Sequence, residues 1–226
     1  AHAVAMQEHA LALVRSAPEL DWTARAESTV LGHLGNIAVG RGDIDAAARF
    51  FEEALDVQRR LGHEPGTSHI MASHPIAGLG DVARARGDLP AALEHYRRAV
   101  SLALRFHDAR AAAYALGGIA GTLAAAGNWP AAARLFGADE AYHERGGYHF
   151  DLETMDRQRA LGVPEPWLRA GDSFGVGQPL RDALWGDRPV GLPPIPDPEA
   201  AAALWEAGRA VSIEESVAEA MVAGLT

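Results

Sequence analysis

The sequence predicts an all-α fold built from consecutive pairs of antiparallel helices, and three observations support this prediction. One helix-turn-helix pattern occurs three times, and in each copy twelve residues separate two small packing residues. An aromatic residue follows the second small residue by four positions. Gly followed by Asp or Asn marks each predicted turn, a combination that ends one helix and begins the next. The packing residues of the three copies are Leu31, Leu34, Gly35, Ala38, Ala47 and Phe51; Ile76, Leu79, Gly80, Ala83, Ala92 and Tyr96; and Leu116, Ile119, Ala120, Leu123, Ala132 and Phe136.

The first predicted element, residues 3–14, has the pattern of the second helix of such a pair. Ala3 and Ala10 fall at the positions that Ala92 and Ala99 occupy in the best copy. Because its first helix and an initiator Met are both missing, we expect the sequence to be part of a longer protein. A first helix is then predicted over residues 22–40, and Asp43 is the expected N-cap of a second helix over residues 44–61.

The next two helix pairs have the same type of turn and N-cap. Asp88 with Pro90, and Asn128 with Pro130, place a capping side chain just before a first-turn proline, whose missing N-H leaves no helical bond unmade. The turns are spaced more widely than in a minimal repeat, and a loop at residues 63–68 is expected to absorb part of the excess.

Residues 146–198 are rich in Gly and Pro and contain scattered aromatic residues. We predict short helices at residues 152–161 and 180–185 of this irregular segment. A helix over residues 198–207 follows, and Ser212 with Glu215 forms a capping box that begins a helix reaching Met221. These last helices are expected to cover the end of the array, with contacts from Leu204, Trp205, Val217 and Met221.

The repeated pattern resembles the tetratricopeptide (TPR) repeat. This resemblance implies a right-handed αα superhelix with a leading half repeat at residues 1–16 and repeats at about 22–62, 69–107 and 110–145, followed by the irregular segment and capping helices at 146–226. Residues 133–141 and 204–217 further resemble the closing part of the TPR region in large bacterial regulators of the LuxR and related signal-transduction ATPase class. In that family a nucleotide-binding module and often a helix-turn-helix flank the repeats.

Composition excludes several functions for this segment. Its net charge of −10 disfavours a nucleic-acid surface, because such binding depends on cations that neutralise phosphates. The chain has no cysteine and no lysine, so it carries neither a thiolate zinc site nor a P-loop. No run of 18 apolar residues and no signal peptide is present, so we expect a cytoplasmic protein without membrane contact.

No catalytic, cofactor or metal site is predicted. Ten histidines are present, but neither His63, His69 and His74 nor His143 and His149 have the spacing of a helical ligand pair. Adjacent acidic pairs diverge by about 100° on a helix, so they do not converge on one substrate.

The candidate binding surface is the groove that the first helices of TPR repeats line. Carrying those positions over selects Asn36, His74, Asp81, Arg84 and Tyr114. Arg84 could pair with a ligand carboxylate, Asn36 could hold a peptide amide, and Tyr114 could offer a flat apolar surface. The competing interpretation is that these are solvated positions of an Ala-rich scaffold.

The predicted function is that of a non-catalytic protein-interaction or signal-sensing domain of a larger bacterial transcriptional regulator. Its partner is a protein, a peptide or a small effector bound in the groove, and no cofactor is expected. One alternative is a free-standing adaptor that binds a peptide. The other is an enzyme with a site in the segment 146–198.

Overall fold

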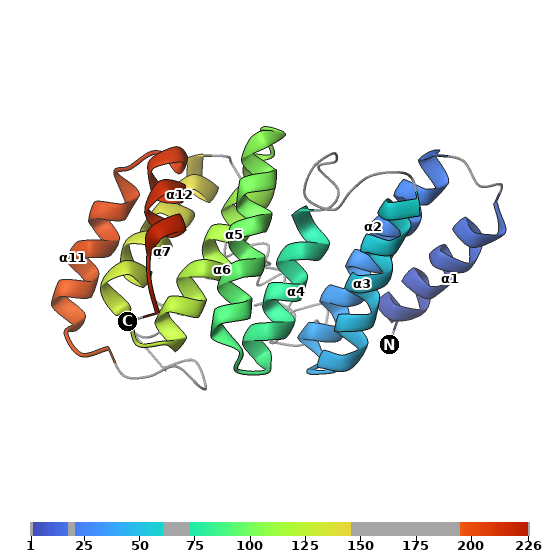
Figure 1. Cartoon of the computed structure of the whole chain (residues 1–226), viewed down its shortest axis with the longest axis horizontal. Helices are drawn as coiled ribbons and strands as arrows, with labels where there is room; N and C mark the ends of the chain where they lie inside the picture. The colour runs from blue at the N-terminus through green and yellow to red at the C-terminus, as the bar shows by residue number, and fades with distance from the viewer. Residues whose placement is uncertain (1, 18–20, 61–72, 146–194, 226) are drawn as a thin grey trace. The chain divides into compact units, whose positions relative to one another are not determined.

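The computed structural model describes residues 2–17, 21–60, 73–145 and 195–225, and every regular element within these ranges is an α-helix (Figure 1). The prediction of an all-α fold is therefore confirmed. The predicted loop at 63–68 and the short helices at 152–161 and 180–185 lie outside the described residues. The helices are α1 (His2–Ser16), α2 (Asp21–Gly40), α3 (Ile44–Arg60), α4 (Ser73–Ala85), α5 (Leu89–Arg105), α6 (Ala109–Ala125), α7 (Trp129–Arg145), α11 (Pro198–Arg209) and α12 (Ile213–Val222).

The chain forms two compact units, residues 1–112 and 113–226. In the first unit consecutive helices pack against one another from α1 to α5, and α2 also contacts α4. In the second unit α7 packs against both α11 and α12. Neighbouring helices in sequence are thus neighbours in space, which is the packing expected of TPR-like pairs. The repeat boundaries proposed above remain predictions.

Four tight turns join successive helices through one shared hydrogen-bonding pattern. In the turn after α4, the Gly87 N-H donates to the carbonyl of Arg84 at 3.0 Å and the Asp88 N-H donates to that of Ala83 at 2.9 Å. This pair of bonds is a Schellman motif, which needs one residue in the left-handed conformation. Glycine supplies that residue in three turns, with φ angles of 74°, 79° and 87°, while His107 supplies it in the turn between α5 and α6 with a φ of 54°.

The residue after each left-handed position caps the next helix. Asp43 Oδ1 accepts from the Ala46 N-H at 3.0 Å, and Asp88 Oδ1 accepts from the Ala91 N-H at 3.1 Å. Asn128 caps α7 in the same way at 3.3 Å, so all three predicted N-caps of the repeats are confirmed. Asp108 caps α6 at 3.0 Å, a cap that the sequence did not predict because its turn lacks glycine.

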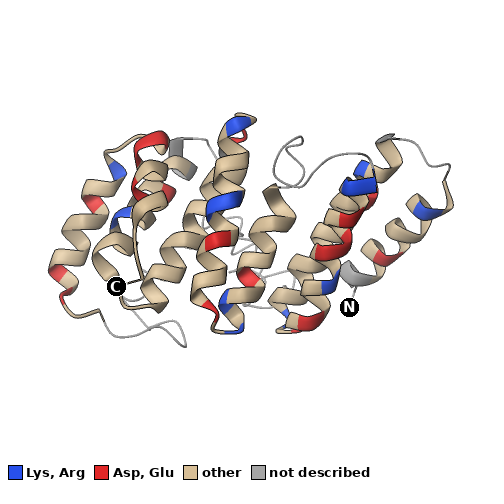
Figure 2. Ribbon diagram, viewed as in Figure 1, with Lys and Arg blue, Asp and Glu red and all other residues tan. Residues whose placement is uncertain are grey.

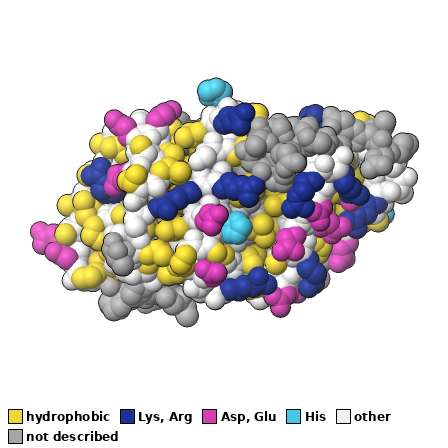
Figure 3. Space-filling model, viewed as in Figure 1, with side chains coloured by type: hydrophobic (Ala, Val, Ile, Leu, Met, Phe, Trp, Pro, Cys, Tyr) yellow, Lys and Arg dark blue, Asp and Glu magenta, His cyan; other side chains and the backbone are white. Residues whose placement is uncertain are grey.

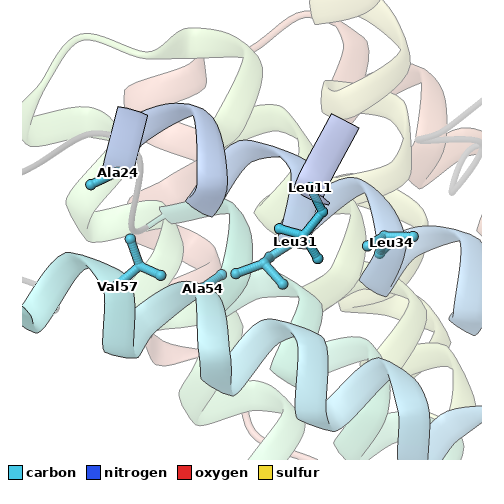
Figure 4. Packing of buried hydrophobic residues seen from close by; sticks show 6 residues of the cluster. All are labelled: Leu11, Ala24, Leu31, Leu34, Ala54 and Val57. Atoms are coloured by element: carbon cyan, nitrogen blue, oxygen red, sulfur yellow. The ribbon is translucent and has the colours of Figure 1, made fainter. Parts of the chain in front are cut away.

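The core of the first unit begins where α1, α2 and α3 meet (Figure 4). Leucines of α2 face small residues of α3, which lets the two helices approach closely. The cluster consists of Leu11, Ala24, Leu31, Leu34, Ala54 and Val57. The charged side chains of α3 are exposed, and the charged residues can be followed along this helix in Figure 2. Charged side chains also stand out on the face of the molecule drawn in Figure 3. The described side chains of α6, by contrast, are mostly buried and none of them is charged.

The three repeat aromatics, Phe51, Tyr96 and Phe136, are fully buried, as their shared position predicts. Phe51 lies between two glycines, Gly35 of its own pair and Gly78 of the next. A methyl group at Gly35 would lie 2.5 Å from Cε1 of the ring, and one at Gly78 would be closer still. The missing side chains therefore form a notch that fits the ring.

The end of the chain packs on α7, as predicted. Trp205 and Val217 are buried, and Ser212 and Glu215 form the expected capping box. Leu204 is half-buried, and Met221 is the most exposed of the four predicted contacts at 41%. The buried face of α12 runs through Ser216, Val217 and Ala220, and the helical rotation of about 100° per residue carries Met221 beyond the edge of that face.

The α7–α11 contact brings backbone against backbone. A methyl group at Gly137 would collide with the carbonyl of Trp205, and one at Gly208 would collide with the carbonyl of Arg134. Around this crossing, Arg134 Nε donates to Glu219 of α12 at 3.1 Å, and the guanidinium of Arg209 lies 4.9 Å from the ring centroid of Trp205. Small residues on both helices thus set the distance between them.

Candidate functional site

The predicted groove residues of the first unit lie on two helices that contact each other, α2 and α4. Asn36 is on α2, and His74, Asp81 and Arg84 are on α4; all four are half-buried. Tyr114 is on α6 in the second unit and is also half-buried. The candidate site therefore consists of the four residues of the first unit.

Asn36 and His74 link the two helices directly. The Asn36 Nδ2 amide lies 3.1 Å from Nε2 of His74, so the amide donates to the ring when Nε2 is unprotonated. The ring lies over Gly32, where a methyl group would come within 3.1 Å of Nδ1. A small residue on α2 thus makes room for the imidazole, and Asn36 fixes its direction.

Asp81 anchors the second half of the site. Its Oδ1 accepts a hydrogen bond from the Tyr96 hydroxyl at 2.6 Å and one from Arg84 Nη2 at 3.3 Å. Burial, reinforced by the charge of Asp81, raises the pKa of Tyr96 well above its usual value, so the hydroxyl stays a donor. Asp81 therefore has a structural role in holding Tyr96 that its groove position did not predict.

Arg84 is the most accessible charged group of the site, with 38% of its side chain exposed against 13% for Asp81. Its pairing with Asp81 orients the guanidinium without burying it. The face then offers a cation, an amide and an imidazole within two adjacent helices. Such groups can hydrogen-bond a peptide backbone or a carboxylate.

The four side chains are an amide, an imidazole, a carboxylate and a guanidinium. None of the four is a Ser, Thr or Cys nucleophile paired with a general base of the kind covalent catalysis needs. Among the described residues, no three His, Asp or Glu side chains converge as a metal site would require. His63, His69 and His149 lie outside the described residues.

A second polar feature, a pocket of about 390 Å³ in the first unit, was not predicted. Four charged residues from α1, α2 and α3 line it: Arg15, Glu27, Glu53 and Arg60. Arg15 Nε donates to Glu27 at 2.8 Å and its Nη2 also pairs with Glu53, while Arg60 reaches Glu27 at 3.3 Å. The hydrogen bond to Glu27 and the neighbouring carboxylates raise the pKa of Arg15 against the opposing effect of burial.

Two cations and two anions leave this pocket without net charge among these groups. We therefore assign it to the packing of α1 on the next pair. Its members are far apart in the sequence, 12 residues for Arg15 and Glu27 and 38 for Arg15 and Glu53. To predict this pocket, one would need to know which charged residues of α1, α2 and α3 face one another. The repeat pattern predicts only the apolar positions.

Comparison with known families gives one result. A family model for the tetratricopeptide repeat matches residues 28–63, which span most of α2, the glycine turn and α3. No curated protein and no solved structure matches the chain. Within the described residues, no helix is long and apolar enough to cross a membrane. The match and the packing of consecutive helices together support a tetratricopeptide repeat domain, a fold that generally serves protein interaction.

Proposed function

We propose that this chain is the protein-interaction or signal-sensing part of a larger bacterial transcriptional regulator, and that a peptide segment of its partner binds across α2 and α4. The role is non-catalytic. The resemblance of residues 133–141 and 204–217 to LuxR-type regulators supports the regulator assignment, and the TPR match supports the interaction role.

One observation carries the binding surface. The Asn36–His74 pair and the Asp81–Arg84 pair place polar groups on adjacent first helices of a chain in which Ala is the commonest residue. Arg84 on α4 supplies a positive charge, and Asn36 on the contacting helix α2 supplies an amide. A peptide carboxylate on Arg84 and a backbone amide on Asn36 are the contacts that this arrangement fits best.

Random peptide libraries displayed on phage provide the test, because no partner needs to be known in advance. Peptides selected on the chain are titrated by fluorescence anisotropy against Asn36→Ala and Arg84→Ala. Each substitution should weaken binding by about 1 kcal/mol, roughly fivefold. Arg84→Ala should change the free energy of unfolding by only about 0.5 kcal/mol, as substitutions of accessible residues usually do. Asn36→Ala also removes the hydrogen bond to His74 and should lower it by about 1 kcal/mol.

Arg49→Ala is the matched control, because Arg49 is an exposed arginine on α3, a second helix of a pair. It should leave both affinity and stability unchanged. Selected peptides that bind all three variants equally would remove the α2–α4 face from consideration. The regulator assignment is tested separately by sequencing the parent gene on both sides: flanking ATPase and helix-turn-helix sequences support it, and a free-standing reading frame supports an adaptor.

A further inference from the structure

Three polar groups occur together in the helix pair formed by α4 and α5: the carboxylate of Asp81, the guanidinium of Arg84 and the hydroxyl of Tyr96. Aligned on the small packing residues, the same positions of the other two pairs carry none of these groups: Asn36, Val39 and Phe51 in one pair, and Gly121, Ala124 and Phe136 in the other. The three groups are thus either all present in a pair or all absent from it.

Packing alone does not account for the hydroxyl of Tyr96. Phe51 and Phe136 fill the equivalent positions, and all three rings are 0% exposed. The ring of Tyr96 also lies in a glycine notch, because a methyl group at Gly80 would come within 2.8 Å of its Cε1, as one at Gly35 would for Phe51. A phenylalanine would make the same apolar contacts, so the hydroxyl serves its polar neighbours.

Two hydrogen bonds of this group converge on one oxygen, Oδ1 of Asp81. The Tyr96 hydroxyl donates to it at 2.6 Å, whereas Arg84 Nη2 lies 3.3 Å away, farther than the 2.7 to 2.9 Å or so usual for a cation and a carboxylate. Two donors on one acceptor atom divide its negative charge, so the hydroxyl weakens the hold of Asp81 on Arg84. The guanidinium side chain is also the more exposed of the ion pair, at 38% against 13%, so it is the member that a ligand can reach.

We propose that Asp81 is an internal competitor for Arg84, and that a carboxylate of the partner peptide binds Arg84 by displacing it. Tyr96 is a positioning residue, because its hydroxyl holds Asp81 in place and keeps the ion pair with Arg84 weak enough to exchange. The inference rests on the proposed function, since it concerns the same α2–α4 face, and it adds a rule of selection. A small free carboxylate gains little over the ion pair that it breaks, whereas a peptide also contacts Asn36, so the site favours peptides.

The first measurement needs no ligand. Rotation of the Arg84 guanidinium about its Nε–Cζ bond is followed by NMR in the full chain, because a hydrogen bond to Asp81 slows this rotation. Tyr96→Phe should slow it by about threefold and Asp81→Asn should speed it by a similar factor, the range of a partly exposed ion pair. A merely structural role of Tyr96 predicts the opposite sign for Tyr96→Phe, since looser packing would speed the rotation.

The second measurement is affinity, with the phage-selected peptides of the preceding section as probes and their fully amidated analogues for comparison. Asp81→Asn should tighten binding of the carboxylate peptides by about threefold, and Tyr96→Phe should weaken it by a similar factor. The double variant should match Asp81→Asn, because Tyr96 acts only through Asp81. The amidated analogues should show neither change.

Asp45→Asn is the matched control, because Asp45 pairs with Arg86 at 2.6 Å and the variant changes the net charge by the same amount. It should leave both measurements unchanged. Unchanged or faster rotation in Tyr96→Phe, or weaker binding of carboxylate peptides by Asp81→Asn, overturns the proposal. Peptides that bind Arg84→Ala as tightly as the wild type would instead reject the proposed function, and the order of the rotation rates then still decides whether Asp81 and Tyr96 control Arg84.

Discussion

The two units use glycine for different contacts. In the first unit, Gly35 and Gly78 leave a space that the ring of Phe51 fills. In the second unit, Gly137 and Gly208 leave no space for a side chain, because the carbonyls of Trp205 and Arg134 lie directly against them. The first arrangement joins helices through an aromatic side chain, and the second joins them through their backbones.

This difference decides how each contact responds to mutation. A side chain can be removed, so a clash with Phe51 can be relieved by a second substitution. A backbone carbonyl cannot be removed, so a clash at Gly137 persists whichever side chain replaces that of Trp205. The predictions below test this distinction from the largest expected effect to the smallest.

Phe51→Ala should produce the largest loss of stability. The ring is fully buried between two helix pairs, so its removal leaves a cavity and should lower the free energy of unfolding by about 3 to 5 kcal/mol in urea melts. Phe50→Ala is the control, since its half-buried ring should cost less. A loss below about 1 kcal/mol for Phe51→Ala would contradict the proposed register.

Gly137→Ala should cost about 2 to 3 kcal/mol, the upper part of the range for overpacked sites. The informative measurement is a pair of double-mutant cycles. With Phe51 replaced by Ala, Gly35→Ala should become stabilising by up to about 1 kcal/mol, because alanine favours the helix and no ring opposes it. With Trp205 replaced by Ala, Gly137→Ala should remain destabilising; full relief there would show that the side chain, not the carbonyl, sets the contact.

Tyr96→Phe probes the polar link that accompanies the second aromatic. Losing the hydrogen bond to Asp81 should cost about 1 to 2 kcal/mol at neutral pH, because the acceptor is a carboxylate. The raised pKa in the folded state means that folding favours the protonated hydroxyl. This stability is complete below pH 10.0, the ordinary tyrosine value, and is lost as the pH rises above it. The wild-type protein should therefore lose more stability between pH 9 and 11 than Tyr96→Phe, and parallel pH curves would count against this role.

His107→Gly should give the smallest effect, and it should be favourable. His107 holds a left-handed φ of 54° in a turn whose three counterparts use glycine. Glycine relieves the strain of the left-handed conformation but has more entropy in the unfolded chain. The net result should be a rise of up to about 1 kcal/mol in the free energy of unfolding. The reverse change, Gly87→Ala, should lower it by a similar amount in the same thermal melts.

Most of the fold could be predicted because its signals are local. The twelve-residue interval between small residues placed Phe51, Tyr96 and Phe136 in the core, and Asp43 and Asp88 revealed helix starts within one turn. The close backbone contacts at Gly137, against Trp205, and at Gly208, against Arg134, could not be predicted in the same way. The two glycines are 71 positions apart, and no periodicity links them.

The candidate site was predicted in part. The groove register selected Asn36 and His74 separately, and the structure shows them in direct contact across two helices. The groove register did not predict that Asp81 accepts a hydrogen bond from Tyr96. A groove position is expected to face solvent, whereas the Tyr96 hydroxyl reaches Asp81 from the following helix.

The four shared turns have a consequence for how the helices open. In each, one Asp or Asn donates its backbone N-H to the preceding helix, while its side-chain oxygen accepts from the following one. Fraying of either helix at that end breaks bonds held by the same residue, so the two ends must melt together. Opening should begin instead at the opposite ends, and the smallest cooperative unit is then a joined pair rather than a single helix.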